Sequence, residues 1–172
     1  MIRALNSSRL QARLRVVCAR DQQGQALVEF MLTIVFLTLL TVAVLEVADF
    51  IYTYSVMADA ANEGVRYAIV HGINSSSAAG PSSGSASSPP CTSANTASAS
   101  SVTGVSAAVK NFAAFSLHNV NASTNNVYVC YLDGNNKLNS EVEVTVSYQY
   151  QPFFFKWPSV TVFANAAGRI VF

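Results

Sequence analysis

The chain has 172 residues, enough for one domain of ordinary size. Charged residues make up 11% of it, less than half of the roughly 25% usual in soluble proteins, and 51% are hydrophobic, which argues against a freely soluble, highly charged globule. The net charge of +1 excludes bulk electrostatic attraction to nucleic acid, which needs many clustered basic residues. We therefore expect no nucleic-acid partner.

The charge is divided unevenly along the chain. Residues 1–24 carry five Arg and one Asp, a net charge of +4. The residues after Gly24 carry five basic and eight acidic side chains, a net charge of −3. The first segment is therefore a basic leader, distinct in character from everything that follows.

A long apolar run comes next. Phe30 to Leu45 is sixteen residues without a charge, and counting from Ala26 the run is twenty residues with Glu29 as its one charge. At ~1.5 Å per helical residue, twenty residues span the ~30 Å hydrocarbon core of a bilayer. This predicts a transmembrane helix over residues 25–48, in contact with the lipid bilayer.

Two other readings of this run are a buried core helix and a secretory signal peptide. A core helix would normally keep a polar face for solvent, which sixteen apolar residues do not provide. A signal peptide ends its apolar region at a small-residue cleavage site, whereas Ala58-Asp59-Ala60 lies more than ten residues beyond Leu45. Because basic residues precede the run and acidic residues follow it, the N-terminus is expected in the cytoplasm.

The apolar periodicity changes after the run but stays helical, which predicts an amphipathic extension over residues 49–72. Its apolar positions recur at spacings of three and four, and we expect them to pack on the C-terminal part of the chain. They are Val47, Phe50, Ile51, Tyr54, Ala58, Ala61, Val65, Ala68 and Ile69. The predicted solvent side holds Glu46, Asp49, Thr53, Asn62, Glu63 and Arg66.

The remaining chain divides into two parts. Residues 73–101 are rich in Ser, Ala and Pro, and such a composition predicts a loop or linker with too little apolar surface to order itself. Residues 102–172 predict a helix near 102–117 followed by antiparallel strands, of which 141–150 is the clearest. Its alternation places Val144 in the core and Glu141 and Glu143 on a solvated face. The expected fold class is α+β, with a long N-terminal helix, transmembrane then amphipathic, packed on a small antiparallel sheet.

The segment Gly24-Gln25-Ala26-Leu27-Val28-Glu29-Phe30 joins the leader to the apolar helix. A lone carboxylate at the edge of a bilayer costs a few kcal/mol unless it is paired. If the chain were cut after Gly24, the new amino group of Gln25 would lie one helical turn from Glu29 and could neutralise it. An uncut anchor with Glu29 among the lipid headgroups is the alternative.

This segment resembles the cleavage site of type IV prepilins, and more closely that of the TadE-like minor pseudopilins of tight-adherence (Flp) pilus systems. A second segment, Ala60 to Ala68, is similar to that family's Ala-Ala-x-Glu-Gly-x-Arg-Tyr-Ala signature. The matching positions include Ala61, Glu63, Gly64, Arg66 and Tyr67. Together the two segments cover residues 24–72.

The resemblance implies a pilin-like fold and cleavage between Gly24 and Gln25 by a membrane-embedded prepilin peptidase. It implies a non-catalytic role in assembling or priming a pilus, with other pilin-like subunits and the assembly machinery as partners. It also implies a single-pass protein of the bacterial inner membrane, or of the pilus itself, with its C-terminal domain outside the cytoplasm. An uncleaved ectodomain that binds a ligand or surface through its sheet and the aromatic loop Phe153–Trp157 is the alternative.

The three cysteines divide between the two sides of the membrane. Cys18 falls in the cytoplasmic leader, whereas Cys91 and Cys130 fall on the external side, where oxidising conditions favour a disulfide between them. We expect no metal site or cofactor, because neither these cysteines nor His71 and His118 have partners at ligand spacing. We expect no enzyme, because no catalytic motif is present.

Overall fold

The computed structural model describes residues 2–98, 100–118, 120, 126–153 and 158–171, with side chains described from Gly24 onward. Its elements in chain order are α1 (Ile2–Val70), α2 (Thr103–Ala113), β1 (Asn126–Tyr131), β2 (Glu141–Tyr150) and β3 (Val160–Arg169). The chain forms two compact units, one ending at Leu45 and the other beginning at Glu46. The boundary therefore falls within α1, at the end of the apolar run.

The first unit is helical, and its side chains from Gly24 to Thr41 are all exposed. The threonine hydroxyls of this stretch are paired within the helix. Thr33, Thr38 and Thr41 each donate to the carbonyl four residues earlier, at 2.8, 2.8 and 2.9 Å. Because these hydroxyls are already satisfied, they add little polarity to an otherwise apolar surface.

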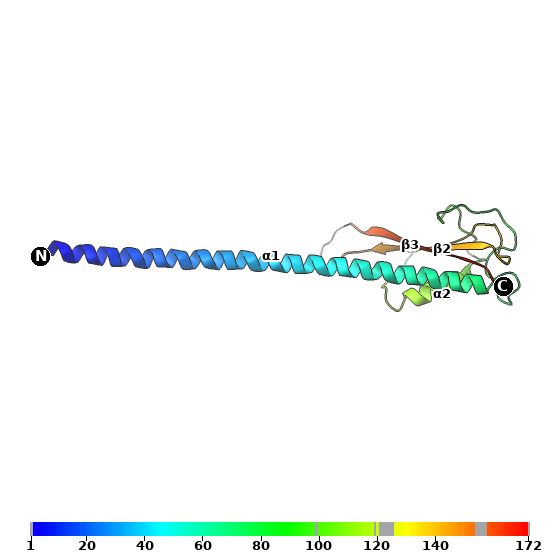
Figure 1. The fold of residues 1–172 in the computed structure, drawn as a ribbon, viewed down its shortest axis with the longest axis horizontal. Helices are drawn as coiled ribbons and strands as arrows, with labels where there is room; N and C mark the ends of the chain where they lie inside the picture. Colours follow the sequence, from blue (N-terminus) through cyan, green and yellow to red (C-terminus); the bar gives the residue numbers. More distant parts are fainter. Residues whose placement is uncertain (1, 99, 119, 121–125, 154–157, 172) are drawn as a thin grey trace. The chain divides into compact units, whose positions relative to one another are not determined.

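The second unit contains a three-stranded antiparallel sheet in the order β1-β2-β3. Figure 1 shows β2 and β3 running beside the last part of α1. The last turns of α1 and the helix α2 cover one face of this sheet and form the core, which includes Val105, Val109 and Val144. A long N-terminal helix with a small antiparallel sheet confirms the predicted α+β fold.

The strands are aligned with α1 in a definite direction. The start of β2 lies near the end of α1, because Val144 faces Gly64. The end of β2 lies near Glu46, because the Tyr150 hydroxyl is bonded to that residue's carboxylate. β2 therefore runs antiparallel to α1. Because β3 pairs antiparallel with β2, β3 runs parallel to α1.

The buried stripe of α1 differs from the predicted one. Its first buried position is Thr53, predicted on the solvent side, whereas Val47, Ile51 and Tyr54, predicted in the core, are exposed. The buried stripe is made of Thr53, Met57, Ala60, Ala61, Gly64, Val65 and Ala68. The small residues bring the helix close to the sheet, and this close approach sets the rotation of α1. The spacing of apolar residues alone does not predict this rotation.

α2 is shorter than predicted. It ends at Ala113, and Ala114 closes it by donating its N–H to the carbonyl of Lys110. Phe115, which falls within the predicted helix range 102–117, lies beyond the end of α2 and is 92% exposed. Leu117 and Val120 follow α2 and belong to the buried core.

The Ser-rich segment forms no helix or strand in its described residues, but it is held in place rather than free. β1 is an edge strand, and the segment covers its open edge at Val129. The Val129 N–H donates to Thr96 Oγ1 at 3.0 Å, and its carbonyl accepts from the Ala97 N–H at 2.8 Å. Pairing of this kind protects an edge strand from adding further strands.

The prediction that Glu143 lies on a solvated face is wrong. Glu143 is only 5% exposed, and its carboxylate accepts a hydrogen bond from Asn165 Nδ2 at 3.3 Å. Glu143 sits directly across the sheet from Cys130, which is bonded to Cys91 of the Ser-rich segment. The disulfide thus brings that segment onto the second face of the sheet, and this long-range contact is invisible to strand alternation. Glu141, at the strand end, is half-buried.

Candidate functional site

The predicted cleavage site lies on an open stretch of helix. Gly24 and Gln25 are exposed, and no heavy atom beyond the local helix comes within 4 Å of the place where a Gly24 side chain would begin. The backbone here is helical, whereas a peptidase requires an extended strand. Glycine destabilises a helix interior by about 1 kcal/mol relative to alanine, so this position favours local unwinding.

Glu29 lies one turn beyond Gln25 and is exposed. Its backbone carbonyl accepts the hydroxyl of Thr33. Among the side chains that the structure describes, none pairs with its carboxylate. The geometry therefore leaves Glu29 available to a cation supplied from elsewhere, and an amino group on Gln25 would be four helical positions away.

The signature segment lies where α1 meets the rest of the second unit. Ala61 is fully buried, and Gly64 is the point of closest approach. A side-chain carbon at Gly64 would stand 2.5 Å from Val109 of α2 and 3.1 Å from Val144 of β2. Only glycine fits between the two elements without moving one of them.

The charged and aromatic members of the signature have separate roles. Glu63 and Arg66 form an exposed ion pair at 3.7 Å, a contact that contributes little to stability. Tyr67 stacks on His71 with ring centroids 3.9 Å apart. His71 Nδ1 donates to the Tyr67 carbonyl at 2.8 Å, which closes the last turn of α1 as a helix cap does.

A second cluster, at the Glu46 end of the unit, was not predicted as a site. The Tyr150 hydroxyl lies 3.1 Å from Asp49 Oδ2 and 3.2 Å from Glu46 Oε2, and the Tyr150 ring meets Phe50 edge-on at 5.3 Å. Burial, the hydrogen bond to Asp49 and the negative charges of both carboxylates raise the pKa of Tyr150. The neutral phenol thus ties the end of the sheet to the first turn after the apolar run.

The structure has the expected disulfide between Cys91 and Cys130. A second tie to the Ser-rich segment was missed by sequence reasoning. Asn136, in the connection between β1 and β2, is buried. It donates its backbone N–H to the Pro81 carbonyl at 2.9 Å and its side-chain Nδ2 to the Ala79 carbonyl at 3.1 Å. The sequence Gly134-Asn135-Asn136 is typical of a turn, and nothing in that pattern marks Asn136 as buried.

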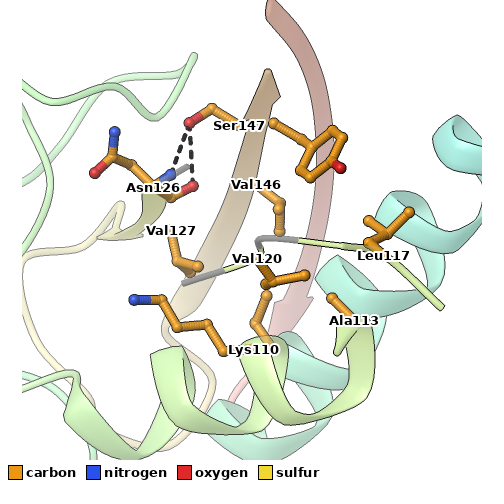
Figure 2. A pocket seen from close by; sticks show the side chains of 10 residues that line it. Lys110, Ala113, Leu117, Val120, Asn126, Val127, Val146 and Ser147 are labelled. Carbon is orange, nitrogen blue, oxygen red and sulfur yellow. Dashed lines mark hydrogen bonds between the residues drawn. The ribbon is translucent and has the colours of Figure 1, made fainter. Parts of the chain in front are cut away.

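A small recess lies between α2, the turn after it and the first two strands. Figure 2 shows its lining, which includes Leu117, Val120, Val127 and Val146. At its rim, Ser147 Oγ accepts the Asn126 N–H and donates to the Asn126 carbonyl, as drawn in Figure 2. The recess holds no more than about one water molecule, so it is a packing gap and not a substrate pocket. Within the described residues, no group of His, Cys, Asp and Glu could hold a metal ion.

The helix from Gly24 to Val70 is long and apolar enough to span a membrane, and none of its most apolar window is buried in the structure. The fold therefore defines a class of protein in which a candidate membrane anchor is followed by a small α+β unit. Residues 24–66 match the model of the family described as TadE-like protein. This match confirms the resemblance stated from the sequence over residues 24–66, which are about a quarter of the chain. Comparison with curated proteins and with solved structures gives no match.

Proposed function

We propose that this chain is a non-catalytic minor pseudopilin that takes part in assembling or priming a tight-adherence pilus after a prepilin peptidase cuts between Gly24 and Gln25. The observation that supports this most strongly is the family match, which begins at Gly24 and ends at Arg66. The match thus includes both the cleavage segment and most of the signature. The basic leader would remain in the cytoplasm and the second unit would lie outside it.

The proposed mechanism uses the cut to change the charge at the edge of the membrane. Before cleavage, Glu29 is a carboxylate at the start of an apolar helix. After cleavage, the Gln25 amino group supplies a cation one turn away, on the same chain or on a neighbouring subunit. Neutralisation lowers the cost of holding Glu29 against lipid or against the apolar helix of another subunit. The close contact at Gly64 holds α2 and β2 on the last part of α1 during assembly.

The test is the N-terminus of the protein recovered from cells with an active prepilin peptidase. We expect Gln25 as the first residue, and the full-length form in cells that lack the peptidase. Replacing Gly24 by Val should leave the full-length form, whereas Glu29→Gln should still be cut but should reduce pilus formation. Recovery of uncut protein from cells with the peptidase would remove the proposal.

An uncleaved, membrane-anchored binding module is the second candidate. One observation favours it, because Phe153 at the start of the aromatic loop is 84% exposed. The rest of that loop, residues 154–157, lies outside the described residues. The same measurement of the N-terminus separates the two candidates. A binding module would keep its leader, and it would bind its target surface in the uncleaved form.

A further inference from the structure

Exposed apolar side chains gather at the end of the second unit that begins with Glu46. Val47, Ile51 and Tyr54 project from one side of α1, and all three are about half exposed or more. Phe153, beyond the end of β2, and Val160, at the start of β3, are exposed as well. We call these five residues the apolar collar.

The two halves of the collar lie at the same level along α1. Val160 pairs directly with Tyr150, whose hydroxyl is bonded to Asp49 and Glu46. Phe153 follows Tyr150 by three residues, so its Cα lies within ~10 Å of that tyrosine. Because β2 runs toward Glu46, the chain leaves the sheet at this end of the unit.

The collar residues of α1 follow the end of the apolar run closely in the sequence. Leu45 is the last residue of the run, and Val47 and Ile51 follow it by two and six helical positions, or ~3 and ~9 Å. The polar interfacial layer of a bilayer is about 5–8 Å thick on each side of the hydrocarbon. Val47 and Ile51 therefore fall within or beside that layer, and Tyr54 follows one turn further out.

We propose that the apolar collar lies in the interfacial layer of the phospholipid bilayer and seats the second unit on the membrane surface. This rests on the proposed membrane anchor. Tyr and Trp side chains concentrate at such interfaces, where an apolar ring meets lipid and a polar group meets water, and Tyr54 is such a residue. The collar adds a second contact with lipid, made by the external unit itself.

The orientation of α1 favours lipid as the occupant. Glu46 and Asp49 are turned toward Tyr150, and Thr53 and Met57 continue that side of the helix into the core. The charged groups of this level are thus held by the sheet, and the opposite side of the helix presents apolar side chains. The apolar run that precedes this level in the sequence has exposed side chains as well.

The test places a single tryptophan in the collar of the full-length protein, reconstituted in vesicles of phosphatidylcholine and phosphatidylglycerol. The natural Trp157 is first replaced by Phe, and Phe153→Trp or Ile51→Trp is then introduced in that background. The matched control is Leu138→Trp, because Leu138 is 64% exposed but lies in the connection between β1 and β2, at the other end of the sheet. Quenching by lipids brominated near the headgroup end of their acyl chains is measured, together with resistance to carbonate extraction.

We expect the fluorescence at both collar positions to fall by about half or more, as for interfacial aromatic residues, while the Leu138→Trp control is unchanged. Unquenched collar tryptophans in a protein that resists carbonate extraction would overturn this inference and leave the anchor intact. A blue-shifted but unquenched emission would overturn it in favour of a protein partner. Extraction of the protein by carbonate would overturn the membrane anchor of the proposed function itself.

Discussion

At the scale of single residues, Tyr150 connects the most distant parts of the sequence in the second unit. Its hydroxyl reaches two carboxylates about a hundred positions earlier in the chain, at the beginning of that unit. Each carboxylate gains a neutral donor in place of water, and the phenol gains two acceptors for one proton. A hydrogen bond to a charged acceptor contributes about 1.5–3 kcal/mol, so this one side chain fixes the end of β2 on α1.

Tyr150→Phe should lower the free energy of unfolding by about 1–2 kcal/mol at neutral pH, because the ring contact with Phe50 remains and only the hydroxyl is lost. The fold favours the neutral phenol, and the pKa of Tyr150 in the folded chain is raised above its usual 10.0. Its contribution is therefore complete below pH 10 and is lost as the pH rises further. Denaturant unfolding in detergent should show a smaller loss of unfolding free energy above pH 10 in Tyr150→Phe than in the wild type.

The matched control for Tyr150 is Tyr54→Phe, because Tyr54 is half exposed on the outer side of the same helix. It should change neither the stability at neutral pH nor the loss above pH 10. Tyr131 and Tyr148 also have raised pKa values and are present in both variants, so the difference between the variants isolates Tyr150. Equal pH profiles for wild type and Tyr150→Phe would contradict this account.

At the scale of elements, the fit of α1 against α2 and β2 depends on small residues. Gly64 stands between Val109 and Val144, and Gly168 of β3 receives Val65 in the same way, since a side-chain carbon there would stand 2.6 Å from it. The sequence could identify Gly64 as a packing notch within a helix. It could not identify the side chains that fill the notch, because Val109 and Val144 lie 45 and 80 positions further along the chain.

Gly64→Leu should destabilise the second unit by about 1–3 kcal/mol, because the larger side chain forces α2 or β2 away from α1. Thermal unfolding of the purified protein in detergent measures this. Asn62→Leu is the control, since Asn62 is exposed on the same stretch of helix and its replacement should stay within about 0.5 kcal/mol. Equal stability of the two variants would show that the elements are not closely fitted at Gly64.

At the scale of the whole molecule, the division at Glu46 separates two kinds of stability. The unit from Glu46 onward holds the sheet, the disulfide and the core, to which α1 contributes Met57, Ala61 and Val65. The unit before it has exposed apolar side chains, which require lipid or other subunits. The two ends of α1 therefore depend on different surroundings.

A fragment of residues 46–172 should fold in water without detergent and with its disulfide formed, because its core is complete. Near-ultraviolet circular dichroism and sedimentation would report a folded species. A shorter fragment of residues 73–172 is the control and should remain unfolded, since it lacks the α1 side chains of the core. Failure of the longer fragment to fold under conditions that keep the disulfide would place part of the required core before Glu46.

Local signals predicted the long helix and the strand over residues 141–150, because each depends on spacing within a few turns. Local signals could not predict three features, because each of these features depends on contacts between distant segments. Glu143 is buried beside Cys130, whose disulfide with Cys91 joins the Ser-rich segment to the sheet at this point. Thr53 faces the core because small residues set the rotation of α1, and Asn136 is buried because the Ser-rich segment packs on it.

The opposite directions of β2 and β3 also have a mechanical consequence. The N–H of Val171, just after β3, donates to the Ile69 carbonyl at 3.0 Å, so β3 ends beside the last turn of α1. Tension applied between Glu46 and Val171 acts along the length of β3. It therefore loads the ladder of hydrogen bonds between β2 and β3 in shear, with many bonds sharing the force at once, rather than opening them one after another. A subunit pulled in this direction would resist a load better than the small size of its sheet suggests.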